Sequence, residues 1–226
     1  MKEKLNFLFI VVGIVVTFVL FSVGPNVAHA LIISADSVSG DDPFNTASRL
    51  IDGSGLNTTG DVSTWTHDFR DGSGLDANWT APTPDPEPFD IDLDFSLGGL
   101  YNLTNIHIWN YTNTTGFFVN RDTTGIDVFT STDGSVYTPK GSFSLVATNN
   151  AVDPEGTQTF ALSGAASHVR LTITANHGPA EHGAQVGLGE VRFEDTTAPI
   201  PEPTTMLLLG SGLIGLAGFR RKFRKK

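Results

Sequence analysis

The clearest alternation of apolar and polar positions runs from Phe89 to Leu97, where every odd residue is apolar and every even residue is polar. A period of two is typical of a β-strand that buries one face and exposes the other. The even positions place Asp90, Asp92 and Asp94 on one face, which favours a solvated strand face over a metal site. The pattern therefore predicts a half-buried strand.

Five further segments are rich in Ile, Val, Thr, Phe and Tyr, the residues most typical of strands: 103–111, 125–130, 157–162, 168–175 and 186–194. Sequences rich in Gly, Asp and Asn, which favour turns, separate them. No part of residues 31–199 repeats its apolar positions every 3.6 residues, as an amphipathic helix does. Many short strands joined by turns predict an all-β fold, an antiparallel β-sandwich of the jelly-roll kind.

Residues 53–88 interrupt this pattern. They are rich in Gly, Thr, Ser and Asp, and their last part, 82–88, has proline at alternate positions. Proline cannot donate to a central strand, so we expect a long loop at one end of the sandwich. Long loops on a rigid sheet are where binding residues tend to lie.

The N-terminus carries an apolar run of a different kind. Lys2 and Lys4 precede a run from Phe7 to Phe21, and small residues close the segment at Ala28-His29-Ala30. This order predicts a helical signal peptide at residues 1–30. The alternative is an uncleaved membrane anchor, because the run is long for a signal peptide.

The C-terminus has three parts in order. The motif Pro201-Glu202-Pro203 comes first, a mostly apolar run at 206–219 follows, and six basic residues lie within 220–226. The run predicts a short transmembrane helix, and the basic residues predict that its end stays in the cytoplasm. The chain therefore divides into a signal peptide (1–30), one β-sandwich domain (31–199) outside the inner membrane and a sorting signal (200–226).

The domain has a different charge from the ends of the chain. Residues 31–199 hold six of the 14 Lys and Arg residues and 22 of the 24 Asp and Glu residues, a formal net charge of −16. This acidity argues against nucleic acid and anionic lipid as partners, and it suits cation binding. The sequence has no cysteine, which excludes disulfides, a catalytic cysteine and thiolate metal sites.

Several segments of the domain, taken in order, resemble the discoidin family, the C-type domain of coagulation factors. The matching pieces are the segments 50–56 (LIDGSGL), 89–93 (FDIDL), 106–111 (IHIWNY), 131–134 (STDG) and 186–193 (VGLGEVRF), with Arg121 before Gly125-Ile126. The resemblance extends over about residues 34–194 and implies a galactose-binding-like jelly roll, which many carbohydrate-binding modules share. The departures lie in loops, where residues 122–124 separate Arg121 from its glycine and residues 94–95 replace another glycine.

The tail is similar to the PEP-CTERM sorting signal in its motif, its short apolar helix and its basic cluster. This resemblance implies a Gram-negative host and an exosortase-type protease as processing partner. It also implies transit through the inner membrane on the C-terminal helix. The destination is then the cell envelope, the outer surface or an exopolysaccharide-rich extracellular matrix.

A set of residue types predicts carbohydrate binding: His67 in the long loop, Trp109, Asn110 and Tyr111 at a strand end, and Arg121 on the next loop. Sugars stack their C–H faces on aromatic rings and pair their hydroxyls with planar polar groups. The resembled fold brings these loops to one end of the sandwich. Trp109 has a second interpretation, because it lies on the strand face opposite Ile108 and can be a packing residue instead of a binding platform.

Asp52, in an Asp-Gly-Ser-Gly turn, and Glu190, at the start of the last strand, are candidate ligands for Ca²⁺. The resemblance implies that these segments meet and hold a structural ion with backbone carbonyls, and Ca²⁺ prefers several oxygen ligands. The alternative is an Asx turn at Asp52 and a surface pair at Glu190. His177 and His182 lack the spacing of a zinc motif, so we interpret them as polar surface.

No motif of a nucleophile, phosphate loop or metalloprotease occurs in the sequence, so we expect no enzyme activity. The sequence predicts an exported envelope or matrix protein whose domain binds carbohydrate. The alternative is a structural or adhesive surface protein whose sandwich binds protein partners and has no sugar site.

Overall fold

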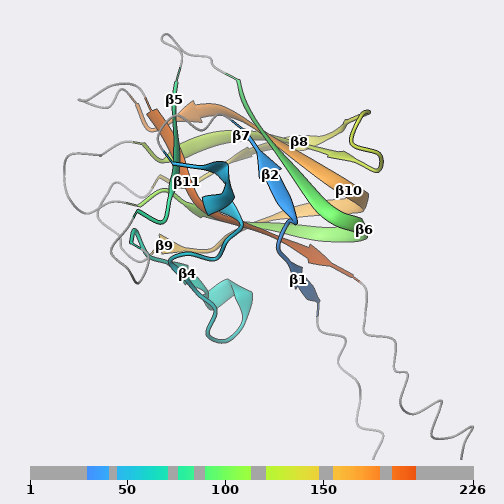
Figure 1. Ribbon diagram of the computed structural model, residues 1–226, viewed down its shortest axis with the longest axis horizontal. Helices are drawn as coiled ribbons and strands as arrows, with labels where there is room; N and C mark the ends of the chain where they lie inside the picture. Colours follow the sequence, from blue (N-terminus) through green and yellow to red (C-terminus); the bar gives the residue numbers. More distant parts are fainter. Residues whose placement is uncertain are drawn as a thin grey trace, which may run out of the picture. The chain divides into compact units, whose positions relative to one another are not determined.

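Two long strands form the centre of the domain, and each combines two of the predicted segments (Figure 1). The alternating segment 89–97 and the segment 103–111 belong to one strand, β6 (Ile91–Asn110). The segments 157–162 and 168–175 likewise form β10 (Gln158–Asn176). β6 and β10 pair antiparallel over most of their length.

Each strand bends near a glycine that lies between its two predicted segments. Gly98 in β6 has φ 71° and Gly164 in β10 has φ 117°, backbone conformations that glycine adopts without steric cost. The register between β6 and β10 shifts at Ala161/Gly164 and again at Ala166/His168. The shifts act as bulges, which bend a strand pair without ending it. Each strand therefore contributes one half to each layer of the sandwich.

The structure is a computed structural model that describes residues 30–40, 45–70, 76–83, 90–112, 121–147, 155–178 and 185–196. Its shorter elements, in chain order, are β1 (Leu31–Ile33), β2 (Ser37–Ser39), the 3₁₀ helix η1 (Ala47–Leu50), β3 (Leu56–Asn57), the 3₁₀ helix η2 (Val62–Thr64), β4 (Thr66–His67), β5 (Trp79–Pro82), β7 (Thr123–Ser131), β8 (Thr138–Ser144), β9 (Glu155–Gly156) and β11 (Gln185–Asp195).

The main sheet has the strand order β1-β11-β6-β10-β7-β8, with β2 also paired to β6 and β5 also paired to β11. All of these strand pairs are antiparallel. The core lies between the layers, where Phe95 of β6 packs edge-to-face on Phe193 of β11 with ring centroids 5.6 Å apart. The prediction of an all-β antiparallel sandwich is confirmed.

The loop predicted at residues 53–88 contributes two strands to a second, small sheet, whose third strand is β9. Its order is β3-β4-β9, and it contacts β6 through β9. The odd positions of β6 face the core up to Leu97, whereas Ile106 and Ile108 face it near the end of the strand. His107 and Trp109 are therefore on the outer side of β6, and Trp65 from the long loop stacks on Trp109. The loop acts as a cover for this side of the sheet.

The predicted signal helix lies outside the described residues, as do the predicted C-terminal transmembrane helix and the motif Pro201-Glu202-Pro203. Within the part of the chain that the structure describes, no helix is both long enough and apolar enough to cross a membrane. Residues 30–197 form one unit with its own core.

Candidate functional site

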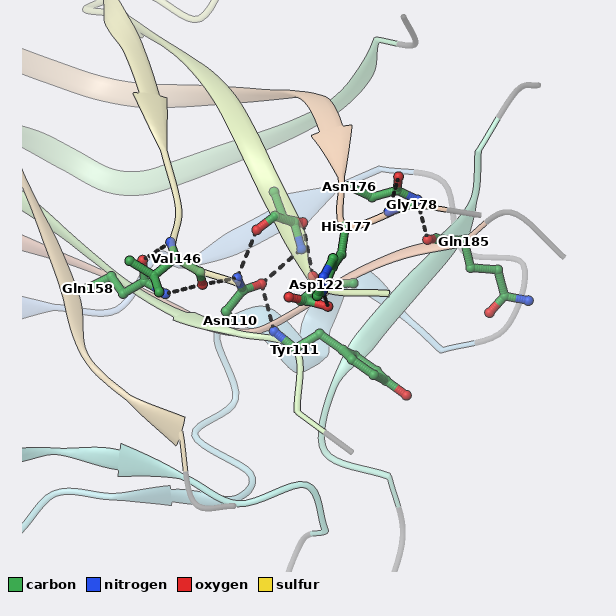
Figure 2. Close-up of polar contacts among 11 residues, drawn as sticks. Asn110, Tyr111, Asp122, Val146, Gln158, Asn176, His177, Gly178 and Gln185 are labelled. Atoms are coloured by element: carbon green, nitrogen blue, oxygen red, sulfur yellow. Dashed lines mark hydrogen bonds and ion pairs between the residues drawn. The ribbon is translucent and has the colours of Figure 1, made fainter. Parts of the chain in front are cut away.

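One end of the sandwich gathers polar side chains from the ends of four strands (Figure 2). β6 ends there and β7 begins there, and β10 ends there while β11 begins. We call this group the polar end, and its members are Asn110, Tyr111, Asp122, Thr123, Asn176, His177 and Gln185.

Asn110 holds the polar end together. Its Oδ1 accepts hydrogen bonds from the backbone N–H groups of Tyr111 (2.9 Å) and Thr123 (3.0 Å). Its Nδ2 donates to the carbonyls of Thr123 (2.8 Å) and Val146 (3.1 Å). An Asn side chain has two donors and two acceptor sites, so all four are used. The buried amide therefore fixes β6, β7 and the segment after β8 in one arrangement.

Asp122 and His177 form the pair that reaches the surface. The Asp122 carboxylate is fully buried, and its Oδ1 lies 3.2 Å from Nδ1 of His177, whose side chain is 29% exposed. The backbone N–H of His177 also donates to the Asp122 carbonyl, at 3.1 Å. A carboxylate at one ring nitrogen orients an imidazole and leaves the other nitrogen for a further contact.

Amide groups continue the polar end beside this pair. Asn176 donates from Nδ2 to the carbonyl of Gln185, at 2.9 Å, and accepts from the backbone N–H of Gly178, at 3.2 Å. These bonds join the end of β10 to the start of β11. Thr123 donates from its hydroxyl to the carbonyl of Gly187, at 3.0 Å, which joins β7 to β11 as well. The imidazole of His177 thus lies beside strands β7, β10 and β11, which these hydrogen bonds join to one another.

Trp109 is fully buried. Its Nε1 donates to the carbonyl of Trp65 at 3.0 Å, and the two rings stack with centroids 6.3 Å apart and planes 20° apart. Trp65 is half-buried and donates from its own Nε1 to Gly60. The loop thus covers the ring of Trp109, an arrangement that favours the packing interpretation over the binding platform.

The other predicted ligand residues are also buried. Tyr111 packs edge-on against Phe69, at 6.5 Å between centroids, and the carbonyl of Arg121 accepts from Gly187 at 2.6 Å. His67 lies under the start of β11, where a Cβ added to Gly189 would stand 2.7 Å from its Nδ1. The structure therefore places Asn110, Tyr111 and Arg121 at or next to the polar end, but not as exposed groups. Their role in ligand binding, and that of His67 and Trp109, stays a prediction.

A further acidic group lies between the small sheet and the polar end. Glu155 of β9 is opposite His67 of β4 and is 8% exposed. Burial raises the pKa of Glu155 to about 7, and the charge of Asp122 acts in the same direction, while a hydrogen bond from Gln158 lowers it. The charge of Asp122 at the polar end therefore acts on a buried carboxyl group of the small sheet.

Asp122, Asn176 and Gln185 are not among the site residues predicted from the sequence, which predicts His177 only as polar surface. A signal was present in the turn sequence Asn176-His177-Gly178, which ends a buried strand and carries two polar side chains. The buried carboxylate was harder to find, because Asp122 lies in a polar stretch with no alternation to show which way it points.

The predicted calcium ligands Asp52 and Glu190 do lie near each other, because the N–H of Gly53 donates to Glu190 Oε2 at 3.3 Å. Asp52 Oδ1 accepts from Ser54 at 2.7 Å as an Asx turn, and Glu190 pairs with Arg192 at 2.6 Å. Across the described residues, no three His, Asp or Glu side chains gather in a way that could hold a metal. The carboxylate oxygens already face protein donors, which does not fit a calcium shell, and the calcium site stays a prediction.

Comparison with known families gives one match, to the PEP-CTERM protein-sorting motif at residues 199–222. The resemblance of the tail is thereby confirmed: the chain carries a sorting signal and is an exported protein that is anchored transiently in the membrane. A search of curated proteins gives no match.

Several solved structures are similar to the domain. CpGH89CBM32-5 from Clostridium perfringens, in complex with GalNAc-β-1,3-galactose, has 16% identity over 73% of this chain and 93% of its own, with a TM-score of 0.45. The family 32 module of C. perfringens NanJ, in complex with galactose, has 14% identity over 73% of this chain and 100% of its own, with a TM-score of 0.47. A fragment of a chitobiase-like protein from Bacteroides thetaiotaomicron has 15% identity over 76% of this chain and 93% of its own, with a TM-score of 0.48. Identities this low transfer no ligand and no binding residue to this chain.

Proposed function

We propose that the domain of this exported protein binds carbohydrate at the polar end. Its site of action is the envelope or extracellular matrix of a Gram-negative bacterium, to which an exosortase-type protease delivers it. The observation that carries the proposal is the partly exposed imidazole of His177, which the fully buried carboxylate of Asp122 holds in one orientation.

The chemistry of sugar recognition supports this assignment. A sugar hydroxyl loses hydrogen bonds to water on binding, so the protein must offer polar groups that already point at the ligand. His177 is oriented by Asp122, and the amide of Asn176 is held by Gln185 and Gly178. Little conformational entropy is then lost when a sugar binds. This is the usual way in which a small, shallow polar site gains affinity.

The test has two steps. The domain, residues 30–197, is first screened on a glycan array. Its binding to the polysaccharide of the bacterium that produces it is then measured by calorimetry. His177→Ala should weaken binding about 2- to 12-fold, which corresponds to the loss of one hydrogen bond of 0.5–1.5 kcal/mol. The matched control is His168→Ala, which removes a partly buried histidine in the middle of β10, where its Nδ1 lies 2.9 Å from Ser167 Oγ. Unchanged glycan binding by folded His177→Ala and Asp122→Asn variants would place the site elsewhere.

The second candidate is a structural or adhesive protein whose domain binds protein partners. The burial of Trp109 favours it, because the predicted aromatic platform for a sugar ring is covered by Trp65. A domain that fails to bind any glycan, and that self-associates or captures a surface protein with an affinity that His177→Ala leaves unchanged, would establish this alternative.

A further inference from the structure

Arg192 of β11 joins three segments that are far apart in the sequence. Its Nη2 lies 2.6 Å from Glu190 Oε1, and its Nη1 donates to the carbonyl of Ile51 at 2.9 Å and to the hydroxyl of Ser34. Its side chain is only 11% exposed. One guanidinium thus ties the last strand to the end of η1 and to the residue that follows β1.

The same position is where the discoidin resemblance implies a calcium ion. Ca²⁺ takes six to eight oxygen ligands, and a site at this junction would use the carboxylates of Asp52 and Glu190 with nearby carbonyls. Here the Ile51 carbonyl and Glu190 Oε1 face Arg192, while Glu190 Oε2 accepts from Gly53 N–H.

Asp52 is engaged in a similar way. Its Oδ1 accepts from the backbone N–H of Ser54 at 2.7 Å, and its Oδ2 lies 3.7 Å from Nη1 of Arg49. The turn that carries Asp52 also packs closely on the guanidinium, because a Cβ added to Gly53 would lie 3.3 Å from Arg192 Nη2. The space beside the turn is therefore filled by a positive group of the protein.

The burial of Glu190 favours a positive group here. Glu190 is fully buried, and its Oε1 lies 2.6 Å from Nη2 of Arg192. A buried carboxylate without a counter-charge is strongly destabilising. Arg suits this position better than Lys, since its planar group has five donors in a fixed geometry and can reach three acceptors at once.

We propose that Arg192 is a built-in cation that takes the place of the structural calcium ion, so that this junction closes without metal. Ser34, Ile51 and Glu190 are then the ligands of a guanidinium instead of ligands of an ion. The proposal does not depend on the carbohydrate-binding function.

The first test is thermal unfolding of the wild-type domain with added calcium and with a chelator. The expected result is the same melting temperature in both, because no ion contributes to the folded state. A lower melting temperature in chelator would overturn the proposal, since a ligand that binds only the folded state must stabilise it.

The second test removes the guanidinium. Arg192→Ala should lower the melting temperature more than the control Arg170→Ala, whose side chain is 33% exposed and pairs with Asp94 on the sheet surface. Calcium should then raise the melting temperature of Arg192→Ala, because Glu190 Oε1 and the Ile51 carbonyl lose the guanidinium that faces them and become available to an ion. A folded Arg192→Ala domain whose melting temperature does not change with calcium would contradict the proposal. If this variant does not fold, the measurement on the wild-type domain alone decides.

Discussion

The polar end and the covered face of β6 use the same chemical pair in opposite ways. At the polar end, the carboxylate of Asp122 is buried and the ring of His177 is 29% exposed. On the covered face, the ring of His107 is 2% exposed and lies 3.3 Å from the carboxylate of Glu194, which is 17% exposed. Nδ1 of His107 also lies 2.9 Å from the Thr159 hydroxyl, and burial lowers the pKa of this ring.

The difference shows what each pair is for. A ring buried between Thr159 and Glu194 has both nitrogens facing the protein, so it can only hold strands together. A ring held from behind by a buried carboxylate keeps one side for the solvent or for a ligand. The presence of a histidine–carboxylate pair does not by itself indicate a function. The useful information is whether the ring or the carboxylate is the buried member.

The largest effect should come from the covered face. Trp109→Ala removes a fully buried ring with a hydrogen bond to Trp65, and we expect a loss of about 3–5 kcal/mol in the free energy of unfolding. Denaturant titration measures this loss. A folded variant of near wild-type stability that no longer binds glycan would show instead that Trp109 is a binding platform, and the comparison would fail.

The next effect should appear in the small sheet, at Glu155. Because its pKa in the folded domain is about 7, the folded state keeps the proton that the unfolded state releases near its ordinary pKa of 4.5. The free energy of unfolding should therefore fall as the pH rises from 4.5 to 7 and then level off. Glu155→Gln, which resembles the neutral acid, should be more stable than wild type by roughly 3 kcal/mol at a pH of about 8.

The control for this prediction is a measurement at low pH. Near a pH of about 4 the Glu155 carboxyl group of the wild type is protonated and therefore neutral, like the amide of Glu155→Gln. The two proteins should then unfold with nearly the same free energy. A constant difference between them at all pH values would mean that the carboxyl group is not perturbed by burial.

The smallest effect should separate the two histidines directly. His107→Ala should cost about 1–3 kcal/mol of stability, because it removes a nearly fully buried ring together with its contacts to Thr159 and Glu194. His177→Ala should change stability by less than about 0.5 kcal/mol, since its ring is partly solvated. Equal losses for the two variants would remove the distinction between a structural and a ligand-facing pair.

Much of the fold follows from alternation in the sequence. The odd residues Leu93 and Phe95 are buried in the core as the pattern predicts, and the segment 186–194 is β11 within one residue at each end. The sequence Leu97-Gly98-Gly99, which indicates a turn, lies instead inside β6. Glycine permits both a turn and a bulge, and only the partner strand β10 decides between them.

The candidate site was less predictable for a physical reason. Period two places Trp109 on the side of β6 opposite Ile108, but it does not reveal that Trp65, 44 residues earlier, covers that side. Whether an outward aromatic residue is a platform or a packing residue depends on such a distant contact. The polar character of residues 110–123 was visible, whereas the burial of Asp122 results from strands that meet only in the fold.

The pairing of β1 with β11 has a mechanical consequence. Leu31 lies opposite Asp195, so the first and last strands of the domain lie side by side there, while the polar end lies at the other end of β11 (Figure 1). If the proposed site holds a ligand while the chain is tethered beyond Asp195, the tension between them runs along β11. The hydrogen bonds of β11 to β6 and β1 lie across that direction, so the load falls on many of them at once as shear instead of opening them one by one. We therefore expect the domain to resist unfolding when force is applied between the chain beyond Asp195 and a ligand at the polar end.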